Sequence, residues 1–164
     1  MRSVLAIGAA GMAAMLLQTG IFPALPYLPV RPDLILVLAG YLGIRHHNSA
    51  AGALGAFLLG YFLDTFSGTI LGMQAFAVTA AYVAMTLMAR HLWMERGLPL
   101  MATVFVGGCV RALAAVGVAA LVATRAQVWQ HVVRYGFLEA AAAALVAPAV
   151  FWWVTWEKRL LGLR

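Results

Sequence analysis

Residues 49–90 decide the fold: they read SAAGALGAFLLGYFLDTF, then the turn Ser67-Gly68-Thr69, then ILGMQAFAVTAAYVAMTLMAR. Both runs are almost wholly apolar and about 20 residues long, the length that an α-helix needs to cross the hydrocarbon core of a bilayer. Serine and glycine in the turn interrupt the apolar pattern and let the chain reverse. The stretch therefore predicts two antiparallel membrane helices, with Asp64 as the charged residue buried in the first.

The composition extends this interpretation to the whole chain of 164 residues. Hydrophobic residues make up 65% and charged residues 10%, and the mean hydropathy is +0.94. Soluble domains average about 25% charged residues, and one of this size buries too little surface to hide so many apolar side chains. We expect a single polytopic membrane domain over residues 1–164, without a soluble domain.

Four further apolar segments flank the two quoted above. They cover residues 3–22, 33–44, 98–124 and 135–156. The first is expected to be a retained helix rather than a cleaved signal peptide, because its apolar run is long and more spans follow it. The second has about 12 residues, too few to cross comfortably, so we expect it to tilt, to begin within the preceding proline-rich stretch, or to be re-entrant. The predicted fold class is an all-α integral membrane protein of about six transmembrane helices.

Basic residues predict the orientation, because cytoplasmic loops carry an excess of Lys and Arg. With six spans and a cytoplasmic N-terminus, seven basic residues fall on the cytoplasmic side and three on the outer side. The cytoplasmic set is Arg2, Arg45, Arg90, Arg96, Lys158, Arg159 and Arg164, and the outer set is Arg31, Arg125 and Arg134. We therefore attribute the net charge of +6 to topology signals rather than to a nucleic-acid surface, and predict both termini in the cytoplasm.

Asp64 and Arg111 are ionisable residues inside predicted spans. Charged groups at membrane depth are costly, so they usually face the protein interior and have a partner. Both lie about 20 Å from the start of their segments, and each lies on a stripe of small residues that recur every fourth position. The stripes are Gly52, Ala56 and Gly60 before Asp64, and Gly107, Ala115 and Ala119 around Arg111. We predict an ion pair between them across a close contact of the third and fifth segments, and favour a structural pair over a proton or ion relay.

Catalytic motifs are missing from the sequence. It contains no GxSxG, Walker-type GxxxxGK[ST] or HExxH pattern, and its single cysteine, Cys109, excludes an intramolecular disulfide. The histidines are spread over both predicted sides of the membrane, whereas a zinc site needs three or four converging ligands. They are His46, His47, His91 and His131. Glu139 is expected at the outer interface, near Arg134. We predict neither an enzyme nor a bound metal or cofactor.

Motifs between residues 32 and 72 resemble those of a known family. They are Pro32-Asp33-Leu34-Ile35-Leu36-Val37-Leu38, then Gly52 and Gly55, then Gly60-Tyr61-Phe62-Leu63-Asp64, then Leu71-Gly72. This pattern resembles the bacterial rod shape-determining MreD family. The resemblance implies a subunit of the cytoplasmic membrane without activity of its own, which binds MreC and helps to build the lateral cell wall. Through MreC it would connect indirectly to MreB, RodA and a penicillin-binding transpeptidase.

The family is also similar in fold to the substrate-binding subunits of energy-coupling-factor vitamin transporters, which supplies a rival function. Those subunits dock a partner through small residues on the first helix, and Ala6, Ala10 and Ala14 are spaced to do so here, or to pack a helix of MreC or an internal neighbour. The predicted outer loops offer few polar groups for a vitamin, so the transporter stays second and a lipid-modifying enzyme third. Pro32 and Asp33 mark the start of the second helix, where a carboxylate caps free backbone donors.

Overall fold

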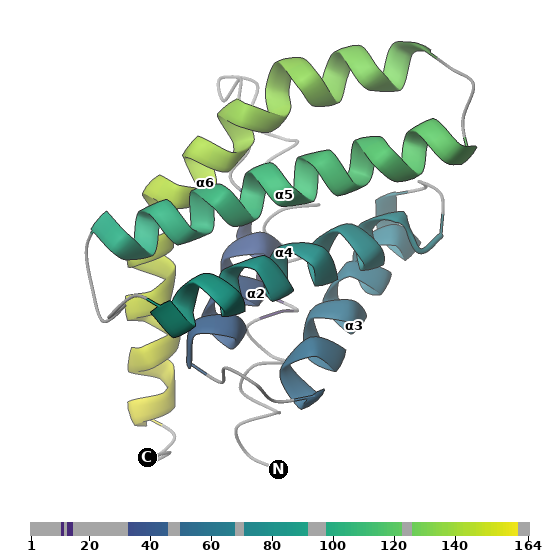
Figure 1. Cartoon of the computed structure of the whole chain (residues 1–164). Coiled ribbons are helices and arrows are strands. Elements are labelled where there is room, and N and C mark those ends of the chain that lie inside the picture. The colour runs from purple at the N-terminus through teal and green to yellow at the C-terminus, as the bar shows by residue number, and fades with distance from the viewer. Residues whose placement is uncertain are drawn as a thin grey trace.

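The computed structural model describes residues 11, 13–14, 33–45, 50–67, 71–91, 98–122 and 126–160. Over these residues the chain is all-helical, with five helices and no strand. The helices are α2 (Leu34–Arg45), α3 (Ala50–Ser67), α4 (Met73–His91), α5 (Leu98–Val122) and α6 (Ala126–Leu160). α5 and α6 lie side by side over much of their length, and α2 packs against all four of the others (Figure 1). Most of the segment predicted at residues 3–22 lies outside the described residues.

α2 forms the centre of the bundle. Asp33 caps it: the backbone N–H of Leu36 donates to Asp33 Oδ1 at 3.1 Å, as expected for a carboxylate at a helix start. The side chains that follow are apolar on every side, and Ile35, Val37 and Ala39 are fully buried. Twelve residues make a helix of about 18 Å, and α2 is a core helix that the other four surround.

α3 and α4 form a hairpin with a very close contact. A Cβ added at Gly60 would lie 2.6 Å from Ala75 Cα, so only glycine lets the two backbones approach this far. Gly72 has φ +93°, a left-handed conformation that L side chains rarely adopt. The N–H of Phe76 then donates to the Gly72 carbonyl at 2.9 Å, which begins α4.

α6 differs from the prediction because it begins at Ala126 instead of near residue 135. Residues 126–134 are too polar for a membrane-crossing segment, but they contain no proline or glycine and so continue the helix. Pro148 lies inside α6, which changes direction along its length (Figure 1). Proline removes a backbone donor and clashes with the preceding turn, so it bends a helix that it does not end.

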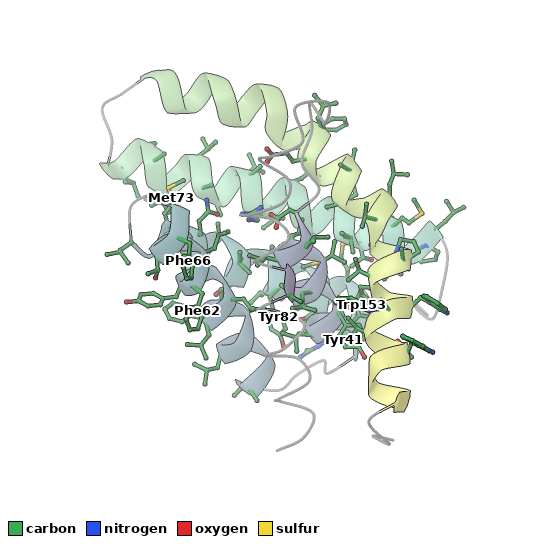
Figure 2. All side chains as sticks on the ribbon, turned by 180° about the vertical axis from the view of Figure 1, so that it is seen from behind. Tyr41, Phe62, Phe66, Met73, Tyr82 and Trp153 are labelled. Atoms are coloured by element: carbon green, nitrogen blue, oxygen red, sulfur yellow. The ribbon has the colours of Figure 1, made fainter. Side chains whose placement is uncertain are left out.

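The outer surface of the bundle is apolar. Phe66, Leu113, Leu121 and Trp152 are 69%, 71%, 89% and 70% exposed, and Figure 2 shows Phe62 and Phe66 on the outer side of α3. Soluble monomers rarely expose apolar patches of this extent. α5 over Leu98–Leu121 and α6 over Gly136–Trp156 are long and apolar enough to cross a membrane. These features indicate a membrane protein.

Candidate functional site: a polar network inside the bundle

Asp64, at the end of α3, binds the start of α4. Its side chain is buried, and three backbone N–H groups donate to it: Gly72 to Oδ2 at 3.0 Å, Gln74 to Oδ1 at 3.0 Å and Ala75 to Oδ2 at 3.1 Å. A helix N-terminus carries a partial positive charge and unsatisfied donors, which stabilise a carboxylate. The N-terminus of α4 therefore stabilises the Asp64 carboxylate, a role that the sequence suggested for Arg111.

Arg111, on α5, forms its ion pair with Asp33. The pair joins α5 to the first turn of α2, because Asp33 Oδ1 caps that helix while Oδ2 meets the guanidinium. A second guanidinium nitrogen, Nη2, donates to Gln74 Oε1 at 2.9 Å. One side chain therefore links α5 to both α2 and α4.

The predicted pairing of Asp64 with Arg111 is corrected by this geometry. α3 packs against α4 and α2 and is not among the helices that pack closely with α5. Gln74 lies between the two charged groups: its backbone N–H donates to Asp64 and its side-chain oxygen accepts from Arg111. Asp64 and Arg111 thus belong to one hydrogen-bonded network, but they are connected through α4.

A pocket of about 110 Å³ adjoins this network. Its polar lining comes from Asp33, Gln74, Arg111 and Glu139, and small residues of α5 and α6 leave the space. The sequence placed Glu139 at the membrane interface. Because α6 begins earlier, Glu139 lies 13 residues beyond the start of the helix and lines the pocket. It is close enough to Arg111 to attract the guanidinium electrostatically.

Comparison with known proteins decides the family. The model of the family described as rod shape-determining protein MreD matches residues 3–155, nearly the whole chain. The chain belongs to the MreD family. No curated protein and no solved structure matches it.

MreD-family proteins are shape-determining proteins and are not known as enzymes. In the described helices, no three His, Cys, Asp or Glu side chains gather to hold a metal.

The small-residue stripes of this MreD-family chain pack against α4 rather than against each other. Gly60, on the α3 stripe with Gly52 and Ala56, meets the backbone of Ala75. On α5, a Cβ at Gly107 would lie 2.6 Å from Met85 Cγ, and Ala115 packs with Met73 and Ala77. α4 therefore separates the two stripes. The predicted close contact between the third and fifth segments is wrong, because the small-residue faces of α3 and α5 both pack against α4.

Four further predicted positions have different outcomes. Ala14 is 6% exposed and buried inside this MreD-family chain, which favours an internal neighbour at that end of the first-helix stripe. Ala6, Ala10 and Pro32 lie outside the described residues. The residue that sequence reasoning missed is Gln74, although an amide in an otherwise apolar run signals a buried hydrogen-bond partner.

Proposed function

We propose that the protein is a non-catalytic membrane subunit of the bacterial cell-wall elongation complex, which binds MreC and helps to maintain rod shape. The family match over residues 3–155 carries this proposal. Through MreC, the subunit connects indirectly to MreB, RodA and a penicillin-binding transpeptidase. Its location is the cytoplasmic (inner) membrane.

The topology that accompanies this role has six spans with both termini in the cytoplasm. Five helices of the described chain supply its second to sixth segments, and the basic residues bias the loops toward that orientation. The fold is proposed to be similar to that of the substrate-binding subunits of energy-coupling-factor transporters. A short, fully buried α2 supports a compact bundle in which one segment stays shielded from lipid.

The polar network suits a scaffold better than a catalyst. Asp33, Asp64, Gln74 and Arg111 hold one another or backbone groups, and together they tie α2, α3, α4 and α5 into one body. Interactions that lock helices in one arrangement preserve the outer surface on which a partner helix docks. A catalytic site would instead present a nucleophile with its base, or a metal.

The test is co-purification of the tagged full-length protein from its native membranes in mild detergent, with bound proteins identified by mass spectrometry. We expect MreC and the wall synthases with the wild type and with Gly117→Ala, an exposed helix position where a Cβ meets no atom within 4 Å. Arg111→Met, which breaks the network, should lose MreC. Absence of MreC from the wild-type sample, with the protein intact, would refute the proposal.

A substrate-binding subunit of an energy-coupling-factor transporter is the alternative, and the polar pocket is the observation that favours it. Its volume argues against a vitamin: about 110 Å³ compares with about 300–1,000 Å³ for sites that enclose drug-sized ligands. Recovery of an ATPase module with its membrane coupling subunit in the same co-purification would establish the transporter role instead.

A further inference from the structure

The described residues that line the pocket between α2, α4, α5 and α6 carry more negative than positive charge. Among the described residues, its ionisable lining consists of one guanidinium, Arg111, and two carboxylates, Asp33 and Glu139. Arg111 pairs directly with Asp33 and donates to Gln74. Glu139 attracts the guanidinium from a distance, but none of the described residues donates a hydrogen bond to it. The carboxylate of Glu139 is thus an acceptor in this pocket that receives no hydrogen bond from the described helices.

We propose that this pocket binds a primary ammonium group, which donates hydrogen bonds to the Glu139 carboxylate. An ammonium carries three donors and one positive charge, so it supplies both what Glu139 lacks and the charge that the pocket lacks. Hydrogen bonds between charged groups are stronger than neutral ones, especially away from water. This inference goes beyond the proposed scaffold function and does not depend on it.

The size of the pocket selects a small group. A volume of about 110 Å³ is smaller than a cavity of about 150 Å³ that binds benzene in another protein, so a group of about four non-hydrogen atoms fits. Ethanolamine has that size. Small residues make up much of the wall, namely Gly108, Ala112, Ala115 and Gly136, and the larger Leu36 and Met73 line the rest of its apolar part. The ligand chemistry is therefore a primary amine on a short polar chain, either free or as the headgroup of phosphatidylethanolamine.

The first measurement uses the full-length protein in nanodiscs of phosphatidylcholine, which has no primary amine. Ethanolamine is titrated and the thermal unfolding midpoint is followed, because a ligand that binds the folded state raises the midpoint in a saturable way. Ethylene glycol is the matched probe, with a hydroxyl in place of the ammonium. We expect saturation with ethanolamine alone. Glu139→Gln, which keeps the volume and removes the charge, should weaken binding about tenfold or more.

A second pair of variants tests the pocket without changing a charge. Ala112→Leu fills it and should abolish ethanolamine binding, while Ala120→Leu makes the same change at an exposed position of α5 and should bind like the wild type. Unfolding midpoints without ligand show that each variant is folded. Native mass spectrometry from nanodiscs that contain phosphatidylethanolamine and phosphatidylglycerol tests the lipid source.

Retention of phosphatidylethanolamine by the wild type and its loss in Glu139→Gln identify a lipid headgroup as the ligand. Saturable ethanolamine binding without lipid retention identifies a soluble amine. Equal effects of ethanolamine and ethylene glycol, or unchanged binding in both Glu139→Gln and Ala112→Leu, would overturn the proposal, as would a wild type that binds neither ethanolamine nor the lipid.

Discussion

Replacing Gly60 by alanine tests the close contact on which the α3–α4 hairpin depends. The new Cβ would lie 2.6 Å from Ala75 Cα, 2.7 Å from the Gln74 carbonyl oxygen and 2.9 Å from Ala75 N. All three are backbone atoms, so no side chain can turn aside. Ordinary contact begins near 3.4 Å, and the two helices must therefore separate by about 0.8 Å.

That separation acts on Asp64, one turn further along α3. The N–H groups of Gln74 and Ala75 donate to its carboxylate at 3.0 and 3.1 Å, and a shift of this size carries them beyond the usual range of about 2.7–3.2 Å. Overpacking costs about 1–3 kcal/mol, and the two stretched bonds to the charged group together add about 1.5–3 kcal/mol. Alanine returns at most about 1 kcal/mol of helix propensity. We expect the free energy of unfolding to fall by about 2–4 kcal/mol.

The assay is reversible unfolding in mixed micelles, with the free energy extrapolated to the native condition. Gly117→Ala is the control, since an added Cβ there meets nothing within 4 Å, and it should raise stability by up to about 1 kcal/mol. The two substitutions are chemically identical and have opposite expected signs. A Gly60→Ala protein as stable as the wild type would refute the argument from backbone proximity.

Four other tests probe the network and its surroundings by the same unfolding assay. Arg111→Met should lower the free energy of unfolding by about 3–5 kcal/mol, because it leaves the buried Asp33 without its cation. A double-mutant cycle of Arg111→Met with Asp33→Asn should show a coupling energy above about 1 kcal/mol. A cycle of Arg111→Met with Asp64→Asn should show weaker coupling; the reverse ranking would restore the pairing predicted from sequence. Gln74→Leu should lower the free energy of unfolding by about 1–3 kcal/mol, since the Arg111 guanidinium loses an acceptor while the backbone donor to Asp64 remains. An unchanged free energy of unfolding would show that the contact between Gln74 and Arg111 does not stabilise the fold. Gly107→Ala should destabilise through Met85 Cγ, 2.6 Å from the new Cβ; Met85→Ala should recover part of the loss, and failure to do so would locate the clash elsewhere.

The helices themselves were largely predictable from the sequence, since apolar runs bounded by turns and charges mark them. The second and fifth predicted segments begin within one residue of α2 and α5. The start of α6 was not predictable in this way, because hydropathy reports the surroundings of a helix and not its hydrogen bonding. Residues 126–134 are polar yet helical, and this extension moves Glu139 away from the helix start.

The partners of the buried charges were harder to predict for a different reason. Matching depths and small-residue stripes identified Asp64 and Arg111 as interior residues, but many rotations of the helices about their axes agree with equal depths. Backbone N–H groups at the start of α4 leave no mark in the sequence, although they satisfy Asp64. The sequence identified Asp33 as the cap of α2. It did not indicate that the second carboxylate oxygen pairs with Arg111.

The enclosed position of α2 constrains the order in which the protein is assembled. Asp33 is made 78 residues before Arg111, the cation that it meets in the folded bundle. A helix of about 18 Å with a carboxylate at its start cannot rest alone in the bilayer at low cost. During synthesis α2 must therefore wait, near the insertion machinery or at the membrane surface, until α4 and α5 arrive to surround it. The bundle closes late, and a chain cut short before α5 lacks the residue that completes its centre.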